Sequence, residues 1–89
     1  MKMTQNEFIS SDLYLSAAIS LLLKTEPTFK VANGRVLFVF LVTDQLYKAM
    51  ASFNSGAALS ALEYSQVLKR LRAEMLLRRT LDQSQKSSK

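Results

Sequence analysis

The 89-residue sequence predicts an α+β fold in which a small antiparallel β-sheet packs with three helices. Two observations carry this prediction. Asn33-Gly34 lies between two β-rich runs and joins them into a hairpin over 28–32/35–41. Three further segments place apolar residues at helical spacing. The length corresponds to a single domain, residues 1–81, and the polar, low-complexity residues 82–89 are expected to form a disordered tail.

The first part of the chain predicts a short extended segment and a buried helix. Residues 7–10, EFIS, form either a third short strand or the lead into that helix. Ser11 or Asp12 can cap the helix, because a short polar oxygen accepts from the free amides of its first turn. Residues 12–24 are apolar around more than half of the helix, which indicates deep burial. The helix is expected to end before Pro27.

The hairpin is the strongest local signal in the sequence. A two-residue type I′ turn needs positive φ at both central positions, and Asn-Gly adopts this conformation most readily. The turn sets Ala32 opposite Arg35 and Phe29 opposite Phe38. One face of the hairpin then carries Phe29, Val31, Val36, Phe38 and Phe40, and the other carries Lys30, Leu37, Val39 and Leu41.

Two more helices are predicted after the hairpin. Thr43 or Asp44 caps the second, over residues 45–54, whose buried stripe is Leu46, Met50 and Phe53. Gly56 is placed where a left-handed residue would follow this helix. Ser60 and Glu63 form a capping-box pattern that starts a third helix, from about residue 61 to about residue 81.

The strand over 35–41 is apolar without alternation, which predicts a central strand covered on both faces. Either the helices are divided between the two faces, or a second subunit closes one face as a homodimer. An uncovered face with Leu37, Val39 and Leu41 would be an unusual patch for a monomer. These three residues are therefore candidates for a partner or dimer interface.

The composition argues against catalysis and against metal or cofactor binding. The chain has no cysteine and no histidine, which removes disulfides, thiolate nucleophiles and the commonest zinc ligands. It has no glycine-rich phosphate loop, and its serines have no histidine to act as a base. The N-terminal residues do not resemble a signal peptide, and the apolar segments are too short to span a bilayer. We therefore expect a cytoplasmic protein that is neither an enzyme nor membrane-bound.

The positive charge is concentrated at the C-terminal end of the chain. Residues 1–68 carry five basic and five acidic groups, whereas residues 69–89 carry seven basic and two acidic groups. A basic helix can contact nucleic-acid phosphates and release their counterions, for either DNA or RNA. The predicted contact residues are Lys69, Arg70, Arg72, Arg78 and Arg79. The alternative interpretation of these residues is a solvated surface that complements the helix dipole.

A second functional hypothesis is a protein-interaction module, such as an accessory subunit or an inhibitor of a larger protein. Leu76 and Leu77 lie outside the predicted core stripe of the third helix, which indicates that its last turns contact something besides their own domain. Such a module would use these leucines together with the exposed sheet face.

Three stretches of the chain form a combined pattern over about residues 8–73: DLYLSAAISLLL, NGRVLFVF and FNSGAALSALEYSQVLKRLRA. This pattern resembles a family of short bacterial and phage proteins classed as a domain of unknown function. Ser16 interrupts the small-residue run of the family's first helix. The resemblance implies a phage or mobile-element setting, where small basic accessory proteins act on nucleic acid or on a partner protein.

Overall fold

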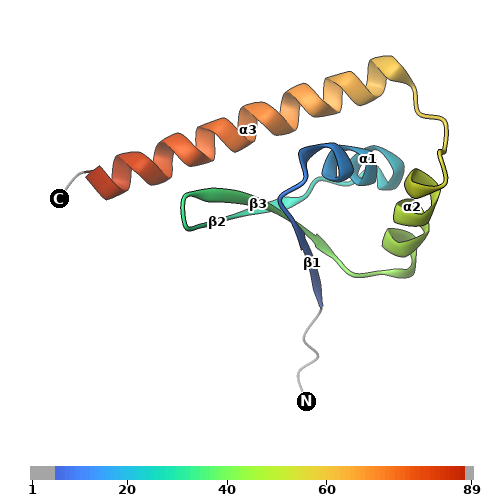
Figure 1. Ribbon diagram of the computed structural model, residues 1–89, viewed down its shortest axis with the longest axis horizontal. Coiled ribbons are helices and arrows are strands. Elements are labelled where there is room, and N and C mark those ends of the chain that lie inside the picture. The colour runs from blue at the N-terminus through green and yellow to red at the C-terminus, as the bar shows by residue number, and fades with distance from the viewer. Residues whose placement is uncertain (1–5, 88–89) are drawn as a thin grey trace.

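A computed structural model describes residues 6–87 of the chain, and the side chains of residues 6–82. It has the predicted α+β fold, and residues 7–10 form the third strand (Figure 1). The elements in chain order are β1 (Glu7–Ser10), α1 (Leu13–Leu23), β2 (Thr28–Ala32), β3 (Arg35–Leu41), α2 (Asp44–Asn54) and α3 (Ala61–Ser87).

The sheet is antiparallel with the strand order β1-β3-β2, so the apolar strand β3 is central as predicted. The predicted hairpin register is confirmed, with Ala32 opposite Arg35 and Phe29 opposite Phe38. Asn33 and Gly34 both have positive φ, 55° and 74°, as a type I′ turn requires. On the other side of β3, β1 pairs from Glu7, opposite Leu41, to Ser10, opposite Phe38.

Short polar side chains start each of the helices. Of the two candidates before α1, Asp12 is the cap, and its carboxylate accepts from two amides of the first turn. Thr43 is the cap of α2. The Ser60 hydroxyl accepts from the Glu63 amide at 3.3 Å and starts α3. Gly56 follows α2 with φ of 85°, in the left-handed region as predicted.

All three helices pack on one face of the sheet, and the core lies between them (Figure 1). Phe38 of β3 has no exposed surface and meets Ile19 of α1, Leu46 of α2 and Leu71 of α3 in one cluster. The Phe29 ring packs edge-on against Phe38, with the ring centroids 5.4 Å apart. The helices therefore cover the aromatic face of the hairpin. This shared core holds α3 in place above the hairpin.

The opposite face of the sheet carries no helix from residues 6–87 (Figure 1). Leu41 is 53% exposed there, but Val39 is only 3% exposed. Val39 lies in the middle of the central strand, with Ile9 of β1 and Thr28 of β2 directly opposite it. Lys30 of β2 and Glu7 of β1 form an ion pair across β3, with Nζ and Oε1 2.9 Å apart.

The helix α3 is longer than predicted. It continues to Ser87, so residues 82–87 are helical, where the sequence analysis expected a disordered tail. No glycine or proline follows Leu81 to stop the helix, and extending an existing helix costs far less than starting one. At 1.5 Å per residue its 27 residues span about 40 Å. Residues 88 and 89 of the predicted tail lie outside the described residues.

Candidate functional site

The rotation of α3 about its own axis decides which of its charged residues face outward. Val67 and Leu71 are buried against the body, and they fix the inner side of the helix. The Tyr64 hydroxyl donates to the backbone carbonyl of Tyr14 at 2.9 Å and ties the first turns of α3 to α1. Residues at other angles around the helix must therefore point to a flank or to solvent.

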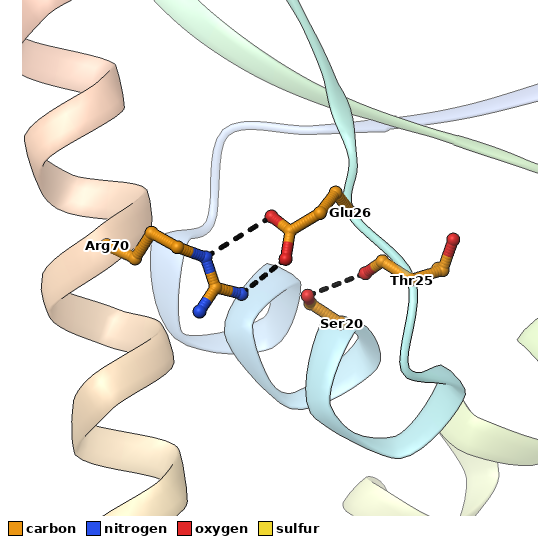
Figure 2. Close-up of polar contacts among 4 residues, drawn as sticks. All are labelled: Ser20, Thr25, Glu26 and Arg70. Carbon is orange, nitrogen blue, oxygen red and sulfur yellow. Dashed lines mark hydrogen bonds and ion pairs between the residues drawn. The ribbon is translucent and has the colours of Figure 1, made fainter.

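Arg70 points to one flank and forms an ion pair with Glu26, in the loop between α1 and β2 (Figure 2). Its Nε and Nη2 atoms donate to the two carboxylate oxygens, one each, in a bidentate arrangement. The Ser20 hydroxyl steadies the same loop by donating to the Thr25 carbonyl at 2.6 Å (Figure 2). Both charged side chains are about half exposed, so we expect about 0–1 kcal/mol of stability from the pair.

Arg78 is directed toward the hairpin. Its guanidinium carbon lies 4.8 Å from the centroid of the Phe29 ring, and its Nε donates to Glu74 at 3.2 Å. The aromatic face attracts the cation, and Glu74 neutralises it. Arg70 and Arg78 are therefore both engaged with groups of their own chain.

Lys69, Arg72 and Arg79 lie on a different flank, which is exposed. At 100° per residue they fall within about 80° of one another around α3, with Leu76 among them. Within the part of the chain whose side chains are described, no carboxylate forms an ion pair with any of these three. The structure thus divides the five predicted nucleic-acid contacts into three outward cations and two that hold α3 to its surroundings.

The residues predicted for a partner or dimer interface are also divided. Leu41 is exposed, Leu37 is half-buried and Val39 is buried, all on the sheet face that the helices leave uncovered. Leu76 and Leu77 are about half exposed on α3, which packs on the other face. One flat interface on this chain could not contain both groups. Leu81, which was not among the predicted interface residues, is 55% exposed one turn after Leu77.

A cavity of about 480 Å³ opens where α1 ends beside the uncovered sheet face. Its apolar wall includes Leu23, Val39 and Leu41, and its two carboxylates are Glu7 and Glu26. Both carboxylates already have basic partners within the chain. The described residues contain no group of three or more acidic, histidine or cysteine side chains that could hold a metal ion.

No helix among the described residues combines the length and the apolar character needed to cross a bilayer. Comparison with known protein families, with curated proteins and with solved structures found no match. The contacts and charges of this chain's own residues are therefore the basis for inferring its function.

Proposed function

We propose that the protein is a small non-enzymatic binding protein that contacts nucleic acid through Lys69, Arg72 and Arg79 of α3. The observation that supports this proposal is the exposed flank on which these cations lie without a carboxylate partner among the described side chains. The family resemblance adds the expectation of a phage or mobile-element accessory protein.

The spacing of the three cations suits a run of phosphates. Lys69 and Arg79 are ten residues apart, which is about 15 Å along a helix. Successive phosphates of one DNA strand advance about 3.4 Å along the duplex axis, so the cations can reach several phosphates of the same strand. These contacts involve no base edges, and binding would tolerate many sequences.

Arg70 and Arg78 have a different role in this proposal. Their charges are neutralised by Glu26 and Glu74, so a phosphate would have to displace a carboxylate before it could bind there. They position α3 on the body and leave phosphate contact to the outward flank.

A matched pair of double variants tests this division. Arg72→Gln/Arg79→Gln and Arg70→Gln/Arg78→Gln remove the same residue type from the same helix and give the same net charge. Labelled duplex DNA and RNA would be titrated at about 50 and 200 mM salt. The logarithm of the DNA binding constant should fall with the logarithm of salt concentration, with a slope near −3 per bound chain for wild type. The Arg72→Gln/Arg79→Gln variant should have a slope that is less negative by about 2.

The inward double variant should keep the wild-type slope. If both double variants lost the same amount of affinity and salt dependence, net charge rather than the outward flank would determine binding. An absence of binding by the wild-type protein to both DNA and RNA at the lower salt concentration would exclude the proposed function.

The uncovered sheet face supports a second candidate, a module that binds a larger protein. Ile9 and Leu41 are exposed on it, and the cavity of about 480 Å³ opens beside Leu41. A nuclease-treated pull-down from the host should then recover one stoichiometric protein, and Leu41→Asp should abolish the recovery. Recovery that disappears with nuclease would argue against this candidate.

A further inference from the structure

The strand β2 is an edge of the sheet, and its outer side is not paired with any strand of residues 6–87. In a hairpin with a two-residue turn, the pair next to the turn, Ala32 and Arg35, exchanges backbone hydrogen bonds. The pairs alternate from there, so Lys30 bonds inward to β3. The amides and carbonyls of Phe29 and Val31 point outward, where a further strand could pair with them.

A groove runs along this edge, with α3 as its second wall. One hollow of about 470 Å³ is lined by residues 26–29 of the chain together with Arg70, Glu74 and Arg78. A second hollow of about 270 Å³ lies between Val31, Arg78, Leu81 and Asp82. Arg78 lines both hollows, so together they follow β2 from its start to Val31.

Apolar side chains are exposed beside the groove. Val31 of β2 is 36% exposed, and Leu77 and Leu81 of α3 are 53% and 55% exposed. At 100° per residue the two leucines are about 40° apart, on the same flank as Arg70 and Glu74. An unpaired strand edge and an apolar helix flank therefore lie next to each other.

The charges of the groove allow an identical copy to approach. Arg70 is paired with Glu26 and Arg78 with Glu74, so the two basic groups on its walls are neutralised within the chain. Lys30 in the middle of β2 is likewise paired with Glu7. Lys69, Arg72 and Arg79, in contrast, lie on the other flank of α3.

We propose that a second copy of the chain pairs its β2 antiparallel to this β2, across a two-fold axis. The edge is self-complementary, because the same outward groups of Phe29 and Val31 serve both chains. Pairing would join two three-stranded sheets into one of six strands. It would also place the two α3 helices side by side, and Leu77 and Leu81 of each chain would be covered.

Matched leucine substitutions test this dimer without touching the core. Leu77→Lys/Leu81→Lys changes the flank beside the groove, and Leu62→Lys/Leu76→Lys changes two other exposed leucines of α3, on a different side of the helix. Sedimentation velocity would be measured between about 5 and 500 µM protein. We expect a dimer for wild type and for the Leu62/Leu76 variant, and at least about tenfold weaker association for the Leu77/Leu81 variant.

Amide hydrogen exchange tests the strand pairing itself. The Phe29 and Val31 amides should be protected in the wild-type dimer and should exchange freely in the Leu77/Leu81 variant at low concentration. A monomer at every concentration would overturn the proposal. So would a dimer in which both amides exchange freely, or one that the Leu62/Leu76 variant weakens as strongly as the Leu77/Leu81 variant does.

Discussion

Ser16 lies in α1 with no exposed surface, and its hydroxyl has no hydrogen-bond partner among the described residues. Burying a hydroxyl without a partner costs about 1–3 kcal/mol. We expect Ser16→Ala to raise the free energy of unfolding by about 1 kcal/mol, measured by urea denaturation. Ser20→Ala is the control, because Ser20 is also buried but donates to Thr25. It should lower the free energy of unfolding, and a loss of stability in Ser16→Ala would contradict the prediction.

The pKa of Tyr64 is raised above its ordinary value of 10.0 by burial, and further by the charges of Asp12 and Tyr14. The folded state therefore holds the phenolic proton more tightly than the unfolded state does. This contribution to stability is complete below pH 10 and is lost as the pH rises from about 10 through the folded-state pKa.

The variant Tyr64→Phe removes both this titration and the hydrogen bond to Tyr14. We expect it to lower the free energy of unfolding by about 1 kcal/mol at pH 7. Above pH 10 its stability should fall less steeply than that of wild type. Urea denaturation of both proteins from pH 7 to about pH 11 measures the difference between their stabilities, to which the groups that both proteins share contribute equally. If the free energies of unfolding of the two proteins changed in parallel with pH, the raised pKa of Tyr64 would be refuted.

At the scale of the elements, the end of α1 offers a site for stabilisation. Lys24 follows the helix with φ of 55° and ψ of 45°, and the amides of Lys24 and Thr25 both donate to the Ser20 carbonyl. Glycine adopts this left-handed conformation without the steric cost of a Cβ atom. We expect Lys24→Gly to raise the free energy of unfolding by about 1 kcal/mol in thermal or urea denaturation. Lys24→Ala, which removes the charge but keeps Cβ, should give no such gain.

The features that were predicted correctly depend on residues that are close together in the sequence. Asn33-Gly34 sets the hairpin register through its own backbone angles, and Ser60 needs only the amide of Glu63 three residues later. The end of α3 was predicted wrongly because residues 82–87 lack apolar side chains. A helix that continues from a segment already packed on the body can extend without further apolar side chains.

The candidate site could be predicted only in part. Helical spacing placed Lys69, Arg72 and Arg79 together, and the structure keeps them together on an exposed flank. The partner of Arg70 is Glu26, 44 residues earlier in the chain, so no local pattern could reveal it. The same holds for the Arg78 guanidinium above the Phe29 ring, which depends on how α3 crosses the hairpin.

At the scale of the whole molecule, the helices on a single face separate three surfaces. One flank of α3 carries Lys69, Arg72 and Arg79, and the other flank borders the edge of β2. The uncovered face of the sheet points away from the helices (Figure 1). A partner on one surface leaves the other two accessible. Arg72→Gln/Arg79→Gln can therefore test nucleic-acid binding, and Leu77→Lys/Leu81→Lys dimer formation, at residues on different flanks of α3.

The strand order also has a consequence for how the chain folds. β2 and β3 are joined by two residues, and such hairpins form in about 1–10 µs. β1 reaches β3 only across α1 and β2, because its partner Leu41 lies 34 residues after Glu7. During synthesis β1 is therefore made before the strand with which it pairs. Neither flanking strand can join the sheet until β3 is present, and β1 must close the longer loop to reach it.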